Sequence, residues 1–166
     1  KVRGGINLVS RLSDDERRRG VATASSGNHG QSIAYAARAF GARAIVTVPE
    51  SANPGKVESM RNLGAKVIFH GDVFDDSREY VERLAREEGY RYIHAANEPQ
   101  LIAGVGTYTL EIIEDLPEVD VIIVPVGAGS GACGACIVAK AINPAIEIVG
   151  VQAARAPAAY MSWKEG

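Results

Sequence analysis

The sequence predicts an α/β protein in three layers, with a mainly parallel sheet covered by helices on both faces. Three observations support this class. Strand-like apolar runs alternate with helix-like runs through most of the 166 residues. The run VIIVPV, at residues 121–126, has no polar alternation, which is typical of a strand buried on both faces. The repeated strand–helix–strand order implies right-handed crossovers between parallel strands.

Glycine and proline mark the ends of several predicted elements. Asn53 and Pro54 open a helix, because proline is favoured in the first helical turn, and Gly64 ends it. Gly89 ends an amphipathic helix over residues 75–88. We expect strands at residues 21–25, 44–48, 66–70, 91–94, 121–126 and 146–151. We expect the remaining helices at residues 31–40, 99–116 and 131–142.

Composition excludes several classes of function. The net charge is −2 and no broad basic field is present, so a nucleic-acid partner is not expected. No apolar run approaches the roughly 18 residues that span a bilayer, and no signal-peptide pattern occurs, which predicts a cytoplasmic protein without a membrane partner. We expect Cys133 and Cys136 to be small core residues in a reducing compartment, because no second cysteine or histidine pair follows them.

A glycine-rich loop after the strand at 121–126 predicts an anion site. It consists of Gly127, Ala128, Gly129, Ser130 and Gly131 and precedes a helix. Small residues allow backbone N–H groups to approach a ligand, and a helix N-terminus attracts phosphate. The alternative is a tight turn without a ligand. A dinucleotide is disfavoured, because an acidic ribose-binding residue is missing at the end of the next strand.

A second polar loop follows the strand at 21–25. It contains Ser25, Ser26, Gly27, Asn28 and His29 and leads into the next helix. Free N–H groups at the helix start, together with these side chains, predict a site for a carboxylate. The alternative is that serine and asparagine only cap the helix.

Four stretches resemble, in the same order, the threonine dehydratase and serine racemase family of pyridoxal 5′-phosphate (PLP) enzymes of fold type II. They are KVRGG, TASSGNHGQSIAYAA, NEPQLIAGVGTYTLEI and VPVGAGSGACG, and the similarity runs from Lys1 to about Gln152. It implies that Lys1 binds PLP covalently, that Asn28 lies beside the cofactor ring, and that the loop 127–131 holds the phosphate.

The resemblance also implies the substrate side of the site. The loop residues Ser25 to His29 would bind the substrate carboxylate, and Ser26 matches a serine proposed as a second acid/base in racemases. Arg78 matches an arginine that reaches the second carboxylate of dicarboxylic ligands. Ala128 and Ser130 depart from the four-glycine run of relatives. Gln152 stands near the position of a metal-binding glutamate, so no metal is predicted.

The activity implied is elimination of water from L-threonine or L-serine, which yields a 2-oxo acid and ammonia. Two alternatives stay open: a PLP-dependent racemase, and a non-catalytic Rossmann-like nucleotide-binding domain in which Lys1 is incidental. Residues 20–97 are expected to form a small lobe, inserted in a large PLP-binding lobe made of 1–19 and 98–166. We expect the chain to be an incomplete, inactive piece of a homo-oligomeric enzyme, with uncovered sheet edges and apolar faces.

Overall fold

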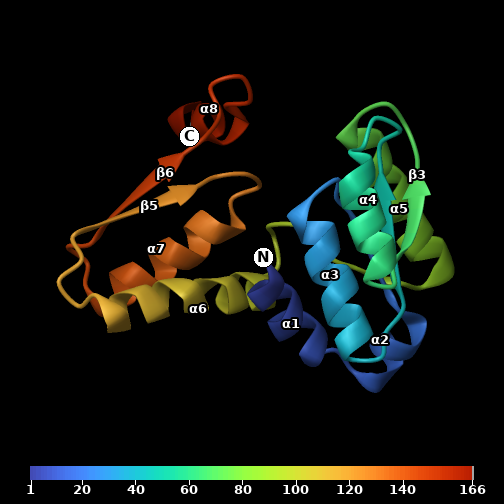
Figure 1. Ribbon diagram of the computed structural model, residues 1–166, viewed down its shortest axis with the longest axis horizontal. Coiled ribbons are helices and arrows are strands. Elements are labelled where there is room, and N and C mark those ends of the chain that lie inside the picture. Colours follow the sequence, from blue (N-terminus) through green and yellow to red (C-terminus); the bar gives the residue numbers. More distant parts are fainter. Residues whose placement is uncertain (166) are drawn as a thin grey trace.

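Two parallel sheets organise the chain, as the computed structural model of residues 1–165 shows (Figure 1). The larger sheet has the strand order β3-β2-β1-β4, and the smaller one pairs β5 with β6. All four pairings are parallel, which confirms the α/β class predicted from the sequence. The strands are β1 (Val21–Ala24), β2 (Ala44–Val48), β3 (Lys66–Phe69), β4 (Arg91–Tyr92), β5 (Val121–Pro125) and β6 (Glu147–Val151).

The helices in the middle of the chain agree with the prediction, except at the N-terminal end of α3, which contributes to the predicted site. Helix α3 begins at Asn28 and not at Gln31, because Gly27 takes the N-cap position. Asn28 and His29 therefore belong to the first helical turn. The helices are α1 (Val2–Ser10), α2 (Asp14–Arg19), α3 (Asn28–Ala39), α4 (Pro54–Asn62), α5 (Phe74–Glu88), α6 (Pro99–Asp115), α7 (Ser130–Ile142) and α8 (Ala158–Glu165).

The larger sheet is covered on both faces. Helices α3 and α4 pack on one face around Val21, Val46 and Val48, and the core of this layer includes Ile33 and Met60. Helix α5 packs on the other face through Val81 and Ala85, against Ala22, Ala24 and Ile45. Successive strand residues thus point into opposite layers, and the three-layer arrangement is present in this part of the chain.

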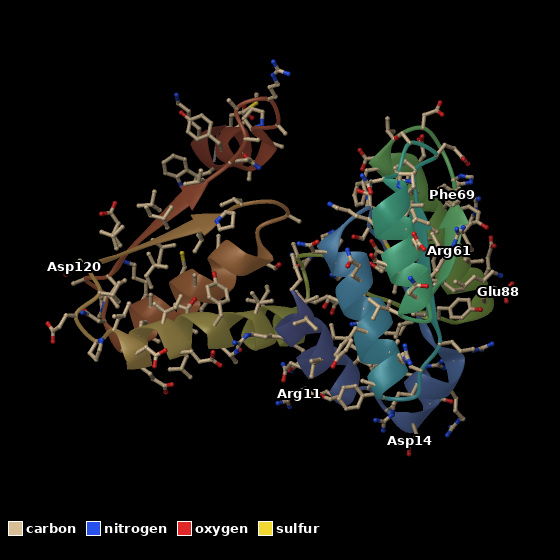
Figure 2. All side chains as sticks on the ribbon, viewed as in Figure 1. Arg11, Asp14, Arg61, Phe69, Glu88 and Asp120 are labelled. Carbon is tan, nitrogen blue, oxygen red and sulfur yellow. The ribbon has the colours of Figure 1, made fainter. Side chains whose placement is uncertain are left out.

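The smaller sheet is covered on one face only within residues 1–165. Ile122 and Val124 of β5 pack against α7 and its neighbour α6, whereas Ile123 on the opposite face is 67% exposed. The prediction that both faces of this strand are buried is wrong for this chain, because no described element covers the second face. The exposure agrees instead with the expectation of uncovered apolar faces. Figure 2 places Asp120, just before β5, at the opposite end of the molecule from Glu88.

The cysteines also differ from the prediction. Cys133 and Cys136 are both free and exposed on α7, so they are not core residues. The inward positions of this helix are taken by Gly134, Ala135 and Ala139, which are buried. The part of the chain that the structure describes contains no helix long and apolar enough to cross a membrane.

Helix α1 joins the two sheet-containing parts of the chain. It packs against both α3 and α6, and the N-terminus lies where these helices meet (Figure 1). Two glycines allow the close approach. A Cβ atom at Gly4 would lie 2.6 Å from the carbonyl oxygen of Leu101 on α6, and one at Gly5 would lie 2.9 Å from that of Ser32 on α3. The glycine pair of KVRGG therefore sets the position of Lys1.

Candidate active site

Lys1 lies against the glycine-rich loop although 129 positions of sequence separate them. Its Nζ donates a hydrogen bond to Ser130 Oγ at 2.5 Å and a longer one to the Ala95 carbonyl at 3.4 Å. The backbone is also fixed, because Ser32 Oγ donates to the Lys1 carbonyl at 2.8 Å. Burial lowers the pKa of the Lys1 amine below its usual value. A larger neutral fraction makes this amine a better nucleophile and base.

The loop itself is open toward the amine. Gly129 is the N-cap of α7 with φ 97°, in the region that favours glycine, and α7 has no side-chain cap. A Cβ atom at Gly127, Gly129 or Gly131 would meet no other atom within 4 Å. These three glycines line the same cavity as Lys1, and the first N–H groups of α7 lack helical acceptors, as at the helix N-termini that bind anions.

The second polar loop presents another helix N-terminus. Helix α3 begins at Asn28 with Gly27 as its N-cap and has no side-chain cap, so neither Ser26 nor Asn28 caps its first turn. Ser25 is buried and its Oγ accepts a hydrogen bond from Gly27 N at 3.2 Å, whereas Ser26 is exposed. Gly30 serves packing, because a Cβ there would lie 2.7 Å from Met60 Sδ.

His29 is buried beneath this helix start and turned toward β1. Its Nε2 lies 3.0 Å from Thr23 Oγ1, which in turn donates to the Ile93 carbonyl at 2.7 Å. Because the Thr23 proton is committed, His29 Nε2 is the donor, and the buried Nδ1 has no hydrogen-bond partner among residues 1–165. Burial, together with the nearby Lys1 charge, lowers the pKa of His29 to about 4. His29 is therefore neutral near pH 7, and only its backbone N–H is available to a carboxylate.

Two cavities meet at Lys1 and Asn28. The first, of about 400 Å³, lies between α6, β5 and the glycine-rich loop, and its lining includes Gly127, Gly129 and Gly131. The second, of about 320 Å³, lies over α1 and α3 and is lined by Gln31, Ser32 and Tyr35 among others. The structure thus brings together the predicted amine, the predicted ring neighbour Asn28 and the predicted phosphate loop.

Other predicted residues lie outside these cavities. Arg78 is on α5 and forms ion pairs with Asp75 at 3.2 Å and Glu82 at 3.4 Å. Six other predicted site residues line neither cavity: Ser25, Ser26, Gly27, His29, Ala128 and Ser130. Gln152 accepts a hydrogen bond from the backbone N–H of Tyr160 at 3.1 Å, at the start of α8.

Sequence reasoning missed three residues that surround Lys1. Ser32 and Ala95 bond to it directly, and Tyr108 on α6 lines the larger cavity. The sequence offered no signal for them, because each acts through a contact between segments distant along the chain.

An amine of lowered pKa, held at a glycine-lined helix N-terminus in a parallel α/β fold, is the arrangement expected of enzymes that use a phosphorylated aldehyde cofactor. The chain belongs to the family described as pyridoxal-phosphate dependent enzyme, whose model matches residues 1–166.

Relatives and solved structures are consistent with this family. The chain is 43% identical over 166 residues to the L-threonine ammonia-lyase of Thermotoga maritima, covering 100% of this chain and 41% of that protein. Maize serine racemase superposes with a TM-score of 0.94 at 36% identity, covering 100% of this chain and 50% of that one. The processed threonine deaminase isoform 2 of Solanum lycopersicum gives 0.92 at 33% identity, covering 99% and 48%. The chain thus spans about half the length of these proteins.

The residues present fit the family's cofactor. The open space beside the three loop glycines accommodates a phosphate, because no side chain competes for it. Ser130 Oγ and the N–H groups at the start of α7 supply donors, and Lys1 supplies the amine that an aldehyde requires.

Proposed function

We propose that this chain forms the lysine-bearing part of a PLP-dependent ammonia-lyase. The substrate is a hydroxy amino acid such as L-threonine or L-serine, and the products are a 2-oxo acid and ammonia. One observation carries the proposal: Lys1 Nζ lies 2.5 Å from Ser130 Oγ, at the N-terminus of the glycine-lined helix α7. The match of the pyridoxal-phosphate dependent family model to residues 1–166 favours this function over a nucleotide-binding domain in which Lys1 is incidental.

The cofactor, when bound, supplies an electron sink that stabilises negative charge at the substrate α-carbon. Lys1 holds the cofactor and, with its lowered pKa, removes the α-proton once its amine is free. The α7 N-terminus and Ser130 bind the phosphate. The α3 N-terminus, with Asn28 at its first position, orients the substrate carboxylate beside Lys1.

Racemisation is the second candidate, favoured by a specific feature of the loop. Ser26 is exposed one residue before the N-cap of α3, so its hydroxyl is accessible for proton exchange, although the residue lines neither cavity. Delivery of a proton from Ser26 to the face opposite Lys1 would invert the α-carbon without loss of water. The two outcomes differ in their products and not in how the cofactor is held.

The test is substitution of Lys1 in the full-length protein, with Lys66→Ala as the matched control on the exposed edge of β3. Lys1→Ala is expected to abolish the visible absorbance of lysine-bound PLP and the release of ammonia and 2-oxo acid, whereas Lys66→Ala retains both. Assaying D-amino acid in the same reactions separates dehydration from racemisation. Retention of cofactor absorbance and activity in Lys1→Ala would reject the assignment.

Several wider predictions accompany this proposal. The division into a small lobe (20–97) and a large lobe (1–19 with 98–166) is supported by the two separate sheets. The role of Arg78 in recognising a second carboxylate, the homo-oligomeric state of the parent enzyme, its place in amino-acid metabolism and its cytoplasmic location stay predictions.

A further inference from the structure

Tyr108 connects the glycine-rich loop to the rest of the molecule. It lies on α6, half-buried, and its ring packs against both the core around the larger sheet and the core around β5 and β6. Its hydroxyl donates a hydrogen bond to the Gly131 carbonyl at 3.1 Å, in the first turn of α7. The same side chain lines the cavity that contains Lys1. Tyr108 therefore lines the cavity, bonds to the first turn of α7 and packs against the cores of both sheets.

The position of the hydroxyl is fixed by helix packing. Helices α6 and α7 approach backbone to backbone at Gly106 and Gly134, where an added Cβ at Gly134 would lie 2.9 Å from Gly106 N. Tyr108 is two residues from this crossing, so neither helix can shift without altering the Tyr108–Gly131 bond. A tyrosine held in this way defines one loop orientation.

The bonded peptide group explains why that orientation matters. The Gly131 carbonyl and the Ala132 N–H belong to one planar peptide unit, so fixing the carbonyl also fixes the direction of the N–H. The Ala132 N–H is among the first N–H groups of α7, which precede the helical bond from Cys133 N to the Gly129 carbonyl. A donor on the carbonyl also polarises the unit and strengthens its N–H.

We propose that Tyr108 is a positioning residue for the phosphate group of the cofactor. Its hydroxyl orients the Gly131–Ala132 peptide, in the first turn of α7, so that the N–H faces the phosphate. The inference rests on the proposed function, because it requires PLP as the ligand of this cavity. It predicts an effect on binding of the phosphate group, since the bonded peptide belongs to the first turn of α7.

The experiment compares PLP with pyridoxal, which keeps the aldehyde but lacks the phosphate. Dissociation constants are measured by absorbance titration of the full-length apoprotein in wild type, Tyr108→Phe and Tyr90→Phe. Tyr90 is the matched control, because it is a half-buried tyrosine packed beneath α5 and outside the site. Thermal unfolding of each variant establishes that the compared proteins are folded.

Loss of one hydrogen bond predicts that Tyr108→Phe binds PLP about 3- to 10-fold more weakly. Its affinity for pyridoxal should stay that of wild type, and Tyr90→Phe should match wild type for both ligands. Equal weakening toward both ligands, or no weakening toward PLP, would overturn the inference. Failure of the wild-type protein to bind PLP would overturn the proposed function itself, and is recognised before any variant is compared.

Discussion

Replacing Gly104 by alanine tests how helix packing places Lys1 at the glycine-rich loop. Gly104 is buried on α6 at its crossing with α1, the helix that follows Lys1. An added Cβ would lie 2.6 Å from both the Arg3 carbonyl oxygen and Asn7 Cβ, and 2.9 Å from Gly4 Cα. Two of these atoms are backbone, so no side-chain rotation relieves the contact.

The magnitude follows from two opposing effects. Alanine is favoured over glycine in a helix interior by about 1 kcal/mol. Overpacking a closed contact costs about 1–3 kcal/mol, and contacts with backbone lie at the upper end of that range. We therefore expect Gly104→Ala to lower the free energy of unfolding by about 1–2 kcal/mol, which corresponds to a Tm decrease of roughly 2–8 °C for a chain of this size.

The assay is urea and thermal unfolding, with Gly55→Ala as the control. Gly55 is an exposed position of α4 where the nearest atom to an added Cβ is Asn53 Oδ1 at 3.4 Å, so alanine should leave stability unchanged or raise it by up to about 1 kcal/mol. The added methyl group would push α1 away from α6 and shift Lys1, which precedes α1. Gly104→Ala should therefore also weaken PLP binding. If Gly104→Ala were as stable as Gly55→Ala, the close α1–α6 contact would not be what positions Lys1.

Three further predictions concern the site. The pKa of His29 is about 4 in the folded protein and near 6.5 in the unfolded chain, so the unfolded chain binds more protons between these pH values. The free energy of unfolding should therefore fall by about 3 kcal/mol as the pH decreases from 6.5 to 4. Urea unfolding across that pH range should show no such loss in His29→Gln. Gly129→Ala places a side chain on a residue with φ 97° and should lower the free energy of unfolding in urea by about 1–3 kcal/mol. Gly127→Ala should lower it less, because Gly127 has no positive φ. Equal losses in the two variants would contradict the argument that backbone strain is the cause. Ser32→Ala removes the 2.8 Å hydrogen bond to the Lys1 carbonyl and should lower the free energy of unfolding in urea by about 0.5–1.5 kcal/mol. A loss near zero would show that the N–H groups of Gly4 and Gly5, which also donate to this carbonyl, are sufficient to hold it.

The central elements were predictable because their patterns are local. The strands and the helices α4 to α7 have apolar runs bounded by glycine or proline, and those boundaries hold within a few residues in the structure. The glycine-rich loop was predictable for the same reason, since a buried strand followed by small residues and a helix leaves few structural alternatives.

The differences arise where tertiary contacts override local preference. Two glycines make the segment at Gly4 and Gly5 a poor helix by propensity, yet it forms α1 because those glycines allow contact with α3 and α6. The small-residue pattern around Cys133 and Cys136 suggested a buried helix, but α7 turns its glycine and alanines inward and its thiols outward. Tyr108 gave no signal, because its partner Gly131 lies on another helix.

A series of backbone contacts sets the distance between the amine and the phosphate loop. Helix α1 carries Lys1 and meets α6 at Gly4 and Gly104, and α6 meets α7 at Gly106 and Gly134. At each crossing the two backbones lie so close that a single added Cβ atom would overlap the other helix. The position of Lys1 relative to the start of α7 is therefore determined by main-chain contacts and not by adaptable side chains. The glycines of these helices therefore contribute to the same site as the glycines of the loop, although only the loop glycines face the cavity. A substitution at either crossing should consequently affect cofactor binding even though it touches no residue of the cavity wall.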